Sequence, residues 1–61
     1  MEQLRERIRT QDTDTILDCI MEIGGGHVEV EKRMVRAALL DVYQERTSEA
    51  DVDALLEVLG M

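Results

Sequence analysis

Sixty-one residues allow one domain at most, and fourteen acidic against seven basic residues give a formal net charge of -7. This charge argues against a phosphate-binding surface over the whole molecule, while an apolar content of 44% is too high for a disordered chain. One cysteine, Cys19, and one histidine, His27, are too few for an internal disulfide or a zinc site.

The N-terminal segment is predicted to form a thin amphipathic helix that breaks near residues 11–13. Leu4 and Ile8 lie one helical turn apart among charged residues. A helix continued past this point would turn Asp12 and Thr13 towards the apolar side. We therefore expect a break or kink, with Asp12 or Thr13 capping the next helix.

A second helix is predicted to end at the three glycines, residues 24–26. Its apolar residues recur at helical spacing: Ile16, Leu17, Ile20 and Ile23. Asp18 and Glu22 lie together on the opposite side, and Cys19 is expected to be a buried small hydrophobe at the edge of the apolar face. Three glycines end a helix and permit almost any backbone direction, so a turn is predicted there.

The clearest helix is predicted over residues 34–45. Its apolar stripe follows the spacing i, i+3, i+4, i+7: Val35, Ala38, Leu39 and Val42. The preceding residues 27–31 alternate apolar and acidic side chains, which is strand periodicity. A short strand that pairs with its copy in a dimer is therefore the alternative there. Helix is favoured because strong helix formers follow at once.

The last segment also carries helix signals. Ser48 and Asp51 fit a capping box, and Gly60 is placed as a left-handed C-cap. One face is apolar: Val52, Leu55, Leu56 and Leu59. The chain is therefore predicted to be a single all-α domain over residues 1–61, a small bundle of three to four short helices. Ala54 and Val58 lie outside the main stripe, so we expect oligomerisation to complete the core.

Few residues form a pattern that could support catalysis or metal binding. Asp12 and Asp14 begin like a calcium loop, but an apolar helical pattern follows where the remaining ligands should be. Helix capping and a solvated acidic face explain these residues better. His27 has no nucleophile arranged beside it, and so short a chain has little room for a closed pocket. We expect no enzymatic activity, no cofactor and no metal.

The layout of charge gives the functional prediction. Two acidic blocks, residues 10–31 and 47–61, contain no Lys or Arg. The negative charge of each block is therefore not neutralised by bases within the block, and acidic surfaces of this kind steer association with cationic partners. We expect a small acidic protein-binding module, similar in size and charge to phage-type inhibitors or adaptors, that occupies a basic surface of a nucleic-acid-handling protein. The candidate partner-binding residues are Asp14, Asp18, Glu22, Asp51 and Asp53.

The alternative is a dimeric nucleic-acid-binding transcriptional regulator that uses Lys32, Arg33 and Arg36. Three bases among fourteen acids are a weak footprint, and interleaved aromatic residues are absent, so the charge balance weighs against direct nucleic-acid binding. No apolar run approaches the roughly 18 residues of a membrane span, and the charged N-terminus lacks the apolar core of a signal peptide. The lone cysteine suits a reducing compartment, and a cytoplasmic location is predicted.

Overall fold

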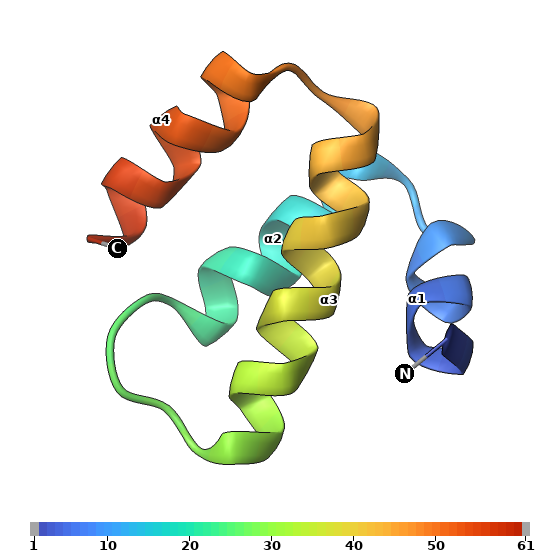
Figure 1. Cartoon of the computed structure of the whole chain (residues 1–61), viewed down its shortest axis with the longest axis horizontal. Helices are drawn as coiled ribbons and strands as arrows, with labels where there is room; N and C mark the ends of the chain where they lie inside the picture. Colours follow the sequence, from blue (N-terminus) through green and yellow to red (C-terminus); the bar gives the residue numbers. More distant parts are fainter. Residues whose placement is uncertain (1, 61) are drawn as a thin grey trace.

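The computed structural model describes residues 2–60, and within them the chain forms four helices and no strand. The helices are α1 (Glu2–Arg9), α2 (Thr13–Ile23), α3 (Val30–Arg46) and α4 (Glu49–Leu59). The longest helix, α3, occupies the centre and contacts the other three, and α4 folds back so that its C-terminal end lies against the α2–α3 loop (Figure 1). The prediction of a small all-α bundle is confirmed.

Local capping interactions set the helix boundaries where the sequence predicted breaks. The Asp12 carboxylate accepts a 2.7 Å hydrogen bond from the backbone N–H of Thr15 and so caps α2. The capping box of Ser48 and Asp51 opens α4, and Gly60 ends it in the left-handed conformation, with φ of 75°. The predicted breaks near residues 11–13, 24–26 and 47–48 are therefore all confirmed.

Residues 27–31 do not form the alternative strand. His27 is exposed in the loop, Glu29 is the N-cap residue, and α3 begins at Val30. The carbonyl of Glu29 accepts a 2.9 Å hydrogen bond from the backbone N–H of Arg33, so this end of the alternating segment already belongs to the helical hydrogen-bond pattern. The strand alternative is therefore wrong for the described chain: residues 27–29 form a loop without strand structure, and residues 30–31 are already helical.

The core forms where α1 and α2 pack against α3. Its buried apolar side chains are Ile8, Ile16, Ile20, Ala38, Leu39, Val42, Tyr43 and Leu55. The predicted stripes therefore face inward, but α4 contributes only Leu55 to this set. Cys19 is exposed, contrary to the sequence-based expectation. Only the side of α2 that carries Ile16 and Ile20 is fully buried, and Cys19 lies beside it at the rim of a groove.

The glycine loop receives the C-terminal end of α4. A Cβ atom on Gly25 would lie 1.9 Å from the carbonyl oxygen of Leu59, a distance that no side chain could occupy without displacing backbone. Gly24 ends α2 with a positive φ of 74°, a conformation that favours glycine. The predicted turn is therefore also a close contact between the α2–α3 loop and α4.

Candidate functional site

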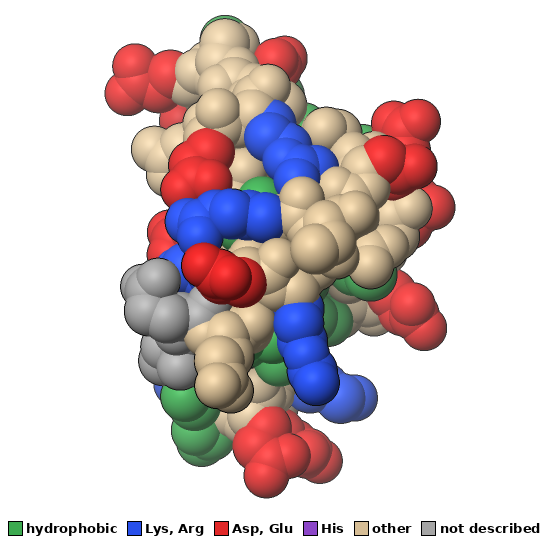
Figure 2. Space-filling model, turned by 90° about the vertical axis from the view of Figure 1, so that its right-hand side faces the viewer, with side chains coloured by type: hydrophobic (Ala, Val, Ile, Leu, Met, Phe, Trp, Pro, Cys, Tyr) green, Lys and Arg blue, Asp and Glu red, His purple; other side chains and the backbone are tan. Residues whose placement is uncertain are grey.

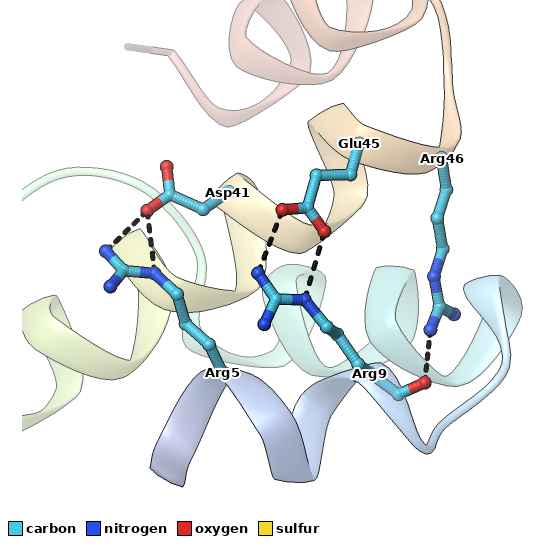
Figure 3. Close-up of polar contacts among 5 residues, drawn as sticks. All are labelled: Arg5, Arg9, Asp41, Glu45 and Arg46. Atoms are coloured by element: carbon cyan, nitrogen blue, oxygen red, sulfur yellow. Dashed lines mark hydrogen bonds and ion pairs between the residues drawn. The ribbon is translucent and has the colours of Figure 1, made fainter. Parts of the chain in front are cut away.

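Two arginines of α1 are paired with carboxylates of α3. Arg5 donates to Asp41 from Nε and Nη2, at 3.2 and 2.7 Å, and Arg9 donates to Glu45 through the same two groups, at 3.1 and 2.9 Å (Figure 3). The arginines lie one turn apart on α1, and the carboxylates lie one turn apart on α3. Both of these acids fall outside the two acidic blocks.

A third arginine closes the end of α1. Arg46 donates from Nη2 to the carbonyl of Arg9, at 2.5 Å, and from Nη1 to the carbonyl of Gln11. Figure 3 shows its guanidinium reaching the backbone at the end of α1. Carbonyls at a helix C-terminus lack partners within the helix and carry partial negative charge, so a guanidinium is well suited to this position.

Arg36 is a buried arginine of α3 that binds backbone carbonyls of the glycine loop after α2. It is only 6% exposed, and its Nη1 donates to the carbonyls of Gly24, at 2.9 Å, and Gly26, at 3.4 Å. The guanidinium thus holds the glycine loop at the C-terminus of α2. Among the three bases of the nucleic-acid alternative, only Lys32 and Arg33 are exposed. This role of Arg36 could not be predicted from the sequence, because Arg36 lies one helical turn from Arg33 and therefore resembles part of a single basic face.

Two carboxyl groups have pKa values displaced by these contacts. The hydrogen bond from Arg9 lowers the pKa of Glu45 below its usual range, with further attraction from neighbouring arginines. Hydrogen bonds from Thr15 lower the pKa of Asp12. Both groups are ionised at neutral pH and serve the architecture, so neither belongs to the candidate site.

The structure brings three candidate residues together in one row. Asp14, Asp18 and Glu22 follow one another at single-turn intervals along the exposed face of α2, and we call them the α2 acidic row. None forms an ion pair with a base among the described side chains. Like charges one turn apart destabilise a helix by about 0.2–0.5 kcal/mol per pair. The row therefore costs folding free energy and presents concentrated negative charge.

The two candidates on α4 lie apart from each other. Asp51 lines a groove shared with α2, and its carboxylate also completes the capping box with Ser48. Asp53 is exposed two residues further on, which places it about 200° around the helix, away from that groove. The structure thus associates Asp51 with α2 and separates Asp53 from both.

Apolar grooves flank the α2 acidic row on both sides. The α2–α4 groove has a volume of about 330 Å³ and is lined by Leu17, Met21, Tyr43, Asp51, Ala54, Leu55 and Val58. The second groove, between α1 and α2, measures about 380 Å³ and includes Arg7, Cys19 and Glu22 at its rim. One indication of the α2–α4 groove is present in the sequence, since Ala54 and Val58 lie outside the apolar stripe of the last segment.

On the face seen in Figure 2, some acidic side chains lie directly beside basic ones, and other acidic side chains project at the edges of the molecule. No group of three or more potential ligands that could hold a metal ion occurs among the described residues. No helix in this part of the chain is long and apolar enough to cross a membrane.

Comparisons with protein-family models, with curated proteins and with solved structures found no match to this chain.

Proposed function

We propose that this protein is an acidic protein-binding module that attaches to a basic surface of a partner, as an inhibitor or adaptor of a nucleic-acid-handling protein would. The observation that supports this proposal is that most basic side chains are engaged in contacts within the fold, whereas the acidic side chains of the α2 acidic row are not. Four of the seven bases, Arg5, Arg9, Arg36 and Arg46, hold the fold together. The α2 acidic row has no basic partner in the described chain, so its charge is available to another molecule.

Electrostatics gives such a row two consequences. Carboxylates concentrated on one exposed helix raise the rate of encounter with a cationic surface, and salt reduces that rate. They also repel nucleic-acid phosphates, which suits a module that meets the basic groove of a nucleic-acid-handling protein in place of its nucleic acid. Asp51 stands beside the same region, whereas Asp53 would meet a partner only if the contact extended around α4.

The regulator alternative has less support. Burial of Arg36 in contacts to glycine carbonyls removes one of its three bases and leaves Lys32 and Arg33 on an acidic chain. Retention of DNA that falls with salt concentration would favour this alternative.

We also propose that the protein self-associates and works in the cytoplasm. Val30 and Met34 are 65% and 45% exposed on the face of α3 that Ala37 continues, and burial of this face by a second copy would remove apolar surface from water. The free cysteine, Cys19, suits a reducing compartment. Sedimentation at increasing concentration should show a dimer that Met34→Lys dissociates, while a monomer at every concentration would contradict the proposal.

Capture of a partner with paired charge reversals tests the binding proposal. A partner retained by the parent protein should be released when Asp14→Lys and Asp18→Lys are combined, with the fold intact by circular dichroism. The matched control combines Glu49→Lys with Glu57→Lys, which changes the net charge equally at exposed positions of α4 outside the groove. Equal losses from both variants would indicate a net-charge effect. Retention of full affinity by the first variant at low salt would exclude the α2 acidic row as the contact.

A further inference from the structure

We propose that the α2–α4 groove binds a cationic amphipathic helix of the partner, with apolar side chains in the groove and basic side chains on the α2 acidic row. This inference rests on the proposed function and specifies the structure of the segment that is recognised. It follows from a pairing already present inside the molecule and from the apolar surface beside the acidic row.

The pairing of α1 with α3 shows what a row of carboxylates on this fold binds. Asp41 and Glu45, one turn apart on α3, hold two arginines that are one turn apart on another helix (Figure 3). The α2 acidic row has the same spacing and one more carboxylate, and it faces outward. A partner helix with arginine or lysine at single-turn intervals would therefore match this row in both charge and spacing.

Charge alone would bind such a helix weakly, because exposed ion pairs are screened by water and salt and each contributes little to affinity. On α1 the arginines are accompanied by Ile8, which is buried in the core. Beside the α2 acidic row the apolar surface is still open. Met21 is 47% exposed and Val58 is 69% exposed, on opposite walls of the α2–α4 groove. Apolar residues of the partner helix would bury both.

The remaining features of the groove favour this occupant over others. Asp51 on the α4 wall adds a fourth carboxylate, across from the three on α2, and this negative charge repels phosphate and attracts a basic helix. A second copy of the chain is a poor match, since Arg5 and Arg9, the bases spaced for such a row, are already paired. The groove between α1 and α2 is a weaker candidate because Arg7 stands at its rim.

Synthetic peptides test the inference directly. One peptide of about 15 residues, long enough to be partly helical alone, carries leucines at single-turn intervals and arginines along the adjacent flank. A second has the same composition in an order that scatters the leucines around the helix. Isothermal titration at low salt should show at least about tenfold tighter binding of the first peptide, which corresponds to about 1.4 kcal/mol. Addition of the first peptide should change the NMR chemical shifts of the protein mainly around Met21, Ala54 and Val58.

Val58→Glu separates apolar binding from attraction by charge. The substitution adds a negative charge, so attraction alone would tighten binding of an arginine-rich peptide. Loss of the apolar wall should instead weaken binding of the amphipathic peptide about tenfold. Gln44→Glu is the matched control, because it adds the same charge at an exposed position outside the groove and should not weaken binding. Melting curves should show that both variants fold.

Three results would overturn the inference. If the two peptides bound equally well, and both bound more tightly to Val58→Glu, charge alone would make the contact. The proposed binding to a basic surface would then remain, but recognition of an amphipathic helix would be excluded. Absence of binding to the parent protein at low salt would exclude a cationic helix as the occupant, whatever the capture experiment shows. Dissociation of a homodimer by Val58→Glu would assign the groove to a second copy.

Discussion

Replacing Arg36 should destabilise the protein far more than replacing Arg33, although the two lie one turn apart on α3. Arg36 is 6% exposed and donates to the Gly24 carbonyl at 2.9 Å, whereas Arg33 is exposed. A hydrogen bond that involves a charged group contributes about 1.5–3 kcal/mol. Because Gly24 is only half-buried, water can partly replace the guanidinium, so Arg36→Met should cost about 1.5 kcal/mol.

The size of the domain makes this loss measurable. A chain of this length has a total stability of about 3–9 kcal/mol, and 1.5 kcal/mol should lower the melting temperature by about 6–12 °C. Arg36→Ala should cost about 1–2 kcal/mol more, because it also removes the buried methylene groups that methionine keeps. Arg33→Met, the matched control, should change stability by less than about 0.5 kcal/mol.

Urea unfolding followed by far-UV circular dichroism measures all three variants. The reasoning fails if Arg36→Met and Arg33→Met unfold at the same urea concentration, since the contact to the glycine loop would then contribute nothing. DNA retention of the same variants provides a second readout. We expect the parent protein and both methionine variants to retain equally little DNA. If the parent retained DNA strongly and the two variants did not, the regulator alternative would regain support.

Three further predictions concern stability. Leu39→Asp should unfold the domain, because Leu39 is 5% exposed in the core and an unpaired buried charge costs several kcal/mol; unchanged thermal unfolding would show that the core is misplaced. Gly25→Ala should lower the free energy of unfolding by about 1–3 kcal/mol, because the new Cβ atom would clash with Leu59. Without that contact, alanine would raise it by about 0.4–1 kcal/mol, so the sign of the change in a urea titration shows whether the contact exists. The lowered pKa of Glu45 means that its stabilising contribution is complete above about pH 4.5 and is lost as pH falls through the folded-state pKa. Glu45→Gln should therefore lower the melting temperature at pH 7 and approach the parent in acid, and an equal deficit at every pH would contradict this assignment.

The sequence by itself determined where the chain breaks between helices and which residues cap several of the helix ends. Asp12, Ser48 and Gly60 act on backbone groups within a few residues of themselves, so their capping could be predicted without knowledge of the fold. The same holds for the apolar period, since one turn of helix decides which side chains share a face. Periodicity left both a helix and a strand open over residues 27–31, because a strand needs a distant partner and periodicity carries no information about one. The structure has a loop at residues 27–29 and helix from Val30.

Only the tertiary structure decided how the charges are used and where open apolar surface remains. Arg36 and Arg33 look equivalent in the sequence, yet packing buries one against the glycine loop and leaves the other exposed. The pairing of Arg5 with Asp41 joins residues that are 36 positions apart, and no local pattern specifies it. The α2–α4 groove likewise depends on how α4 packs. Leu55 is buried in the core and Val52 and Leu59 are partly buried against it, while Val58 is left exposed opposite α2. These properties depend on which helices meet, and contacts between distant segments determine that.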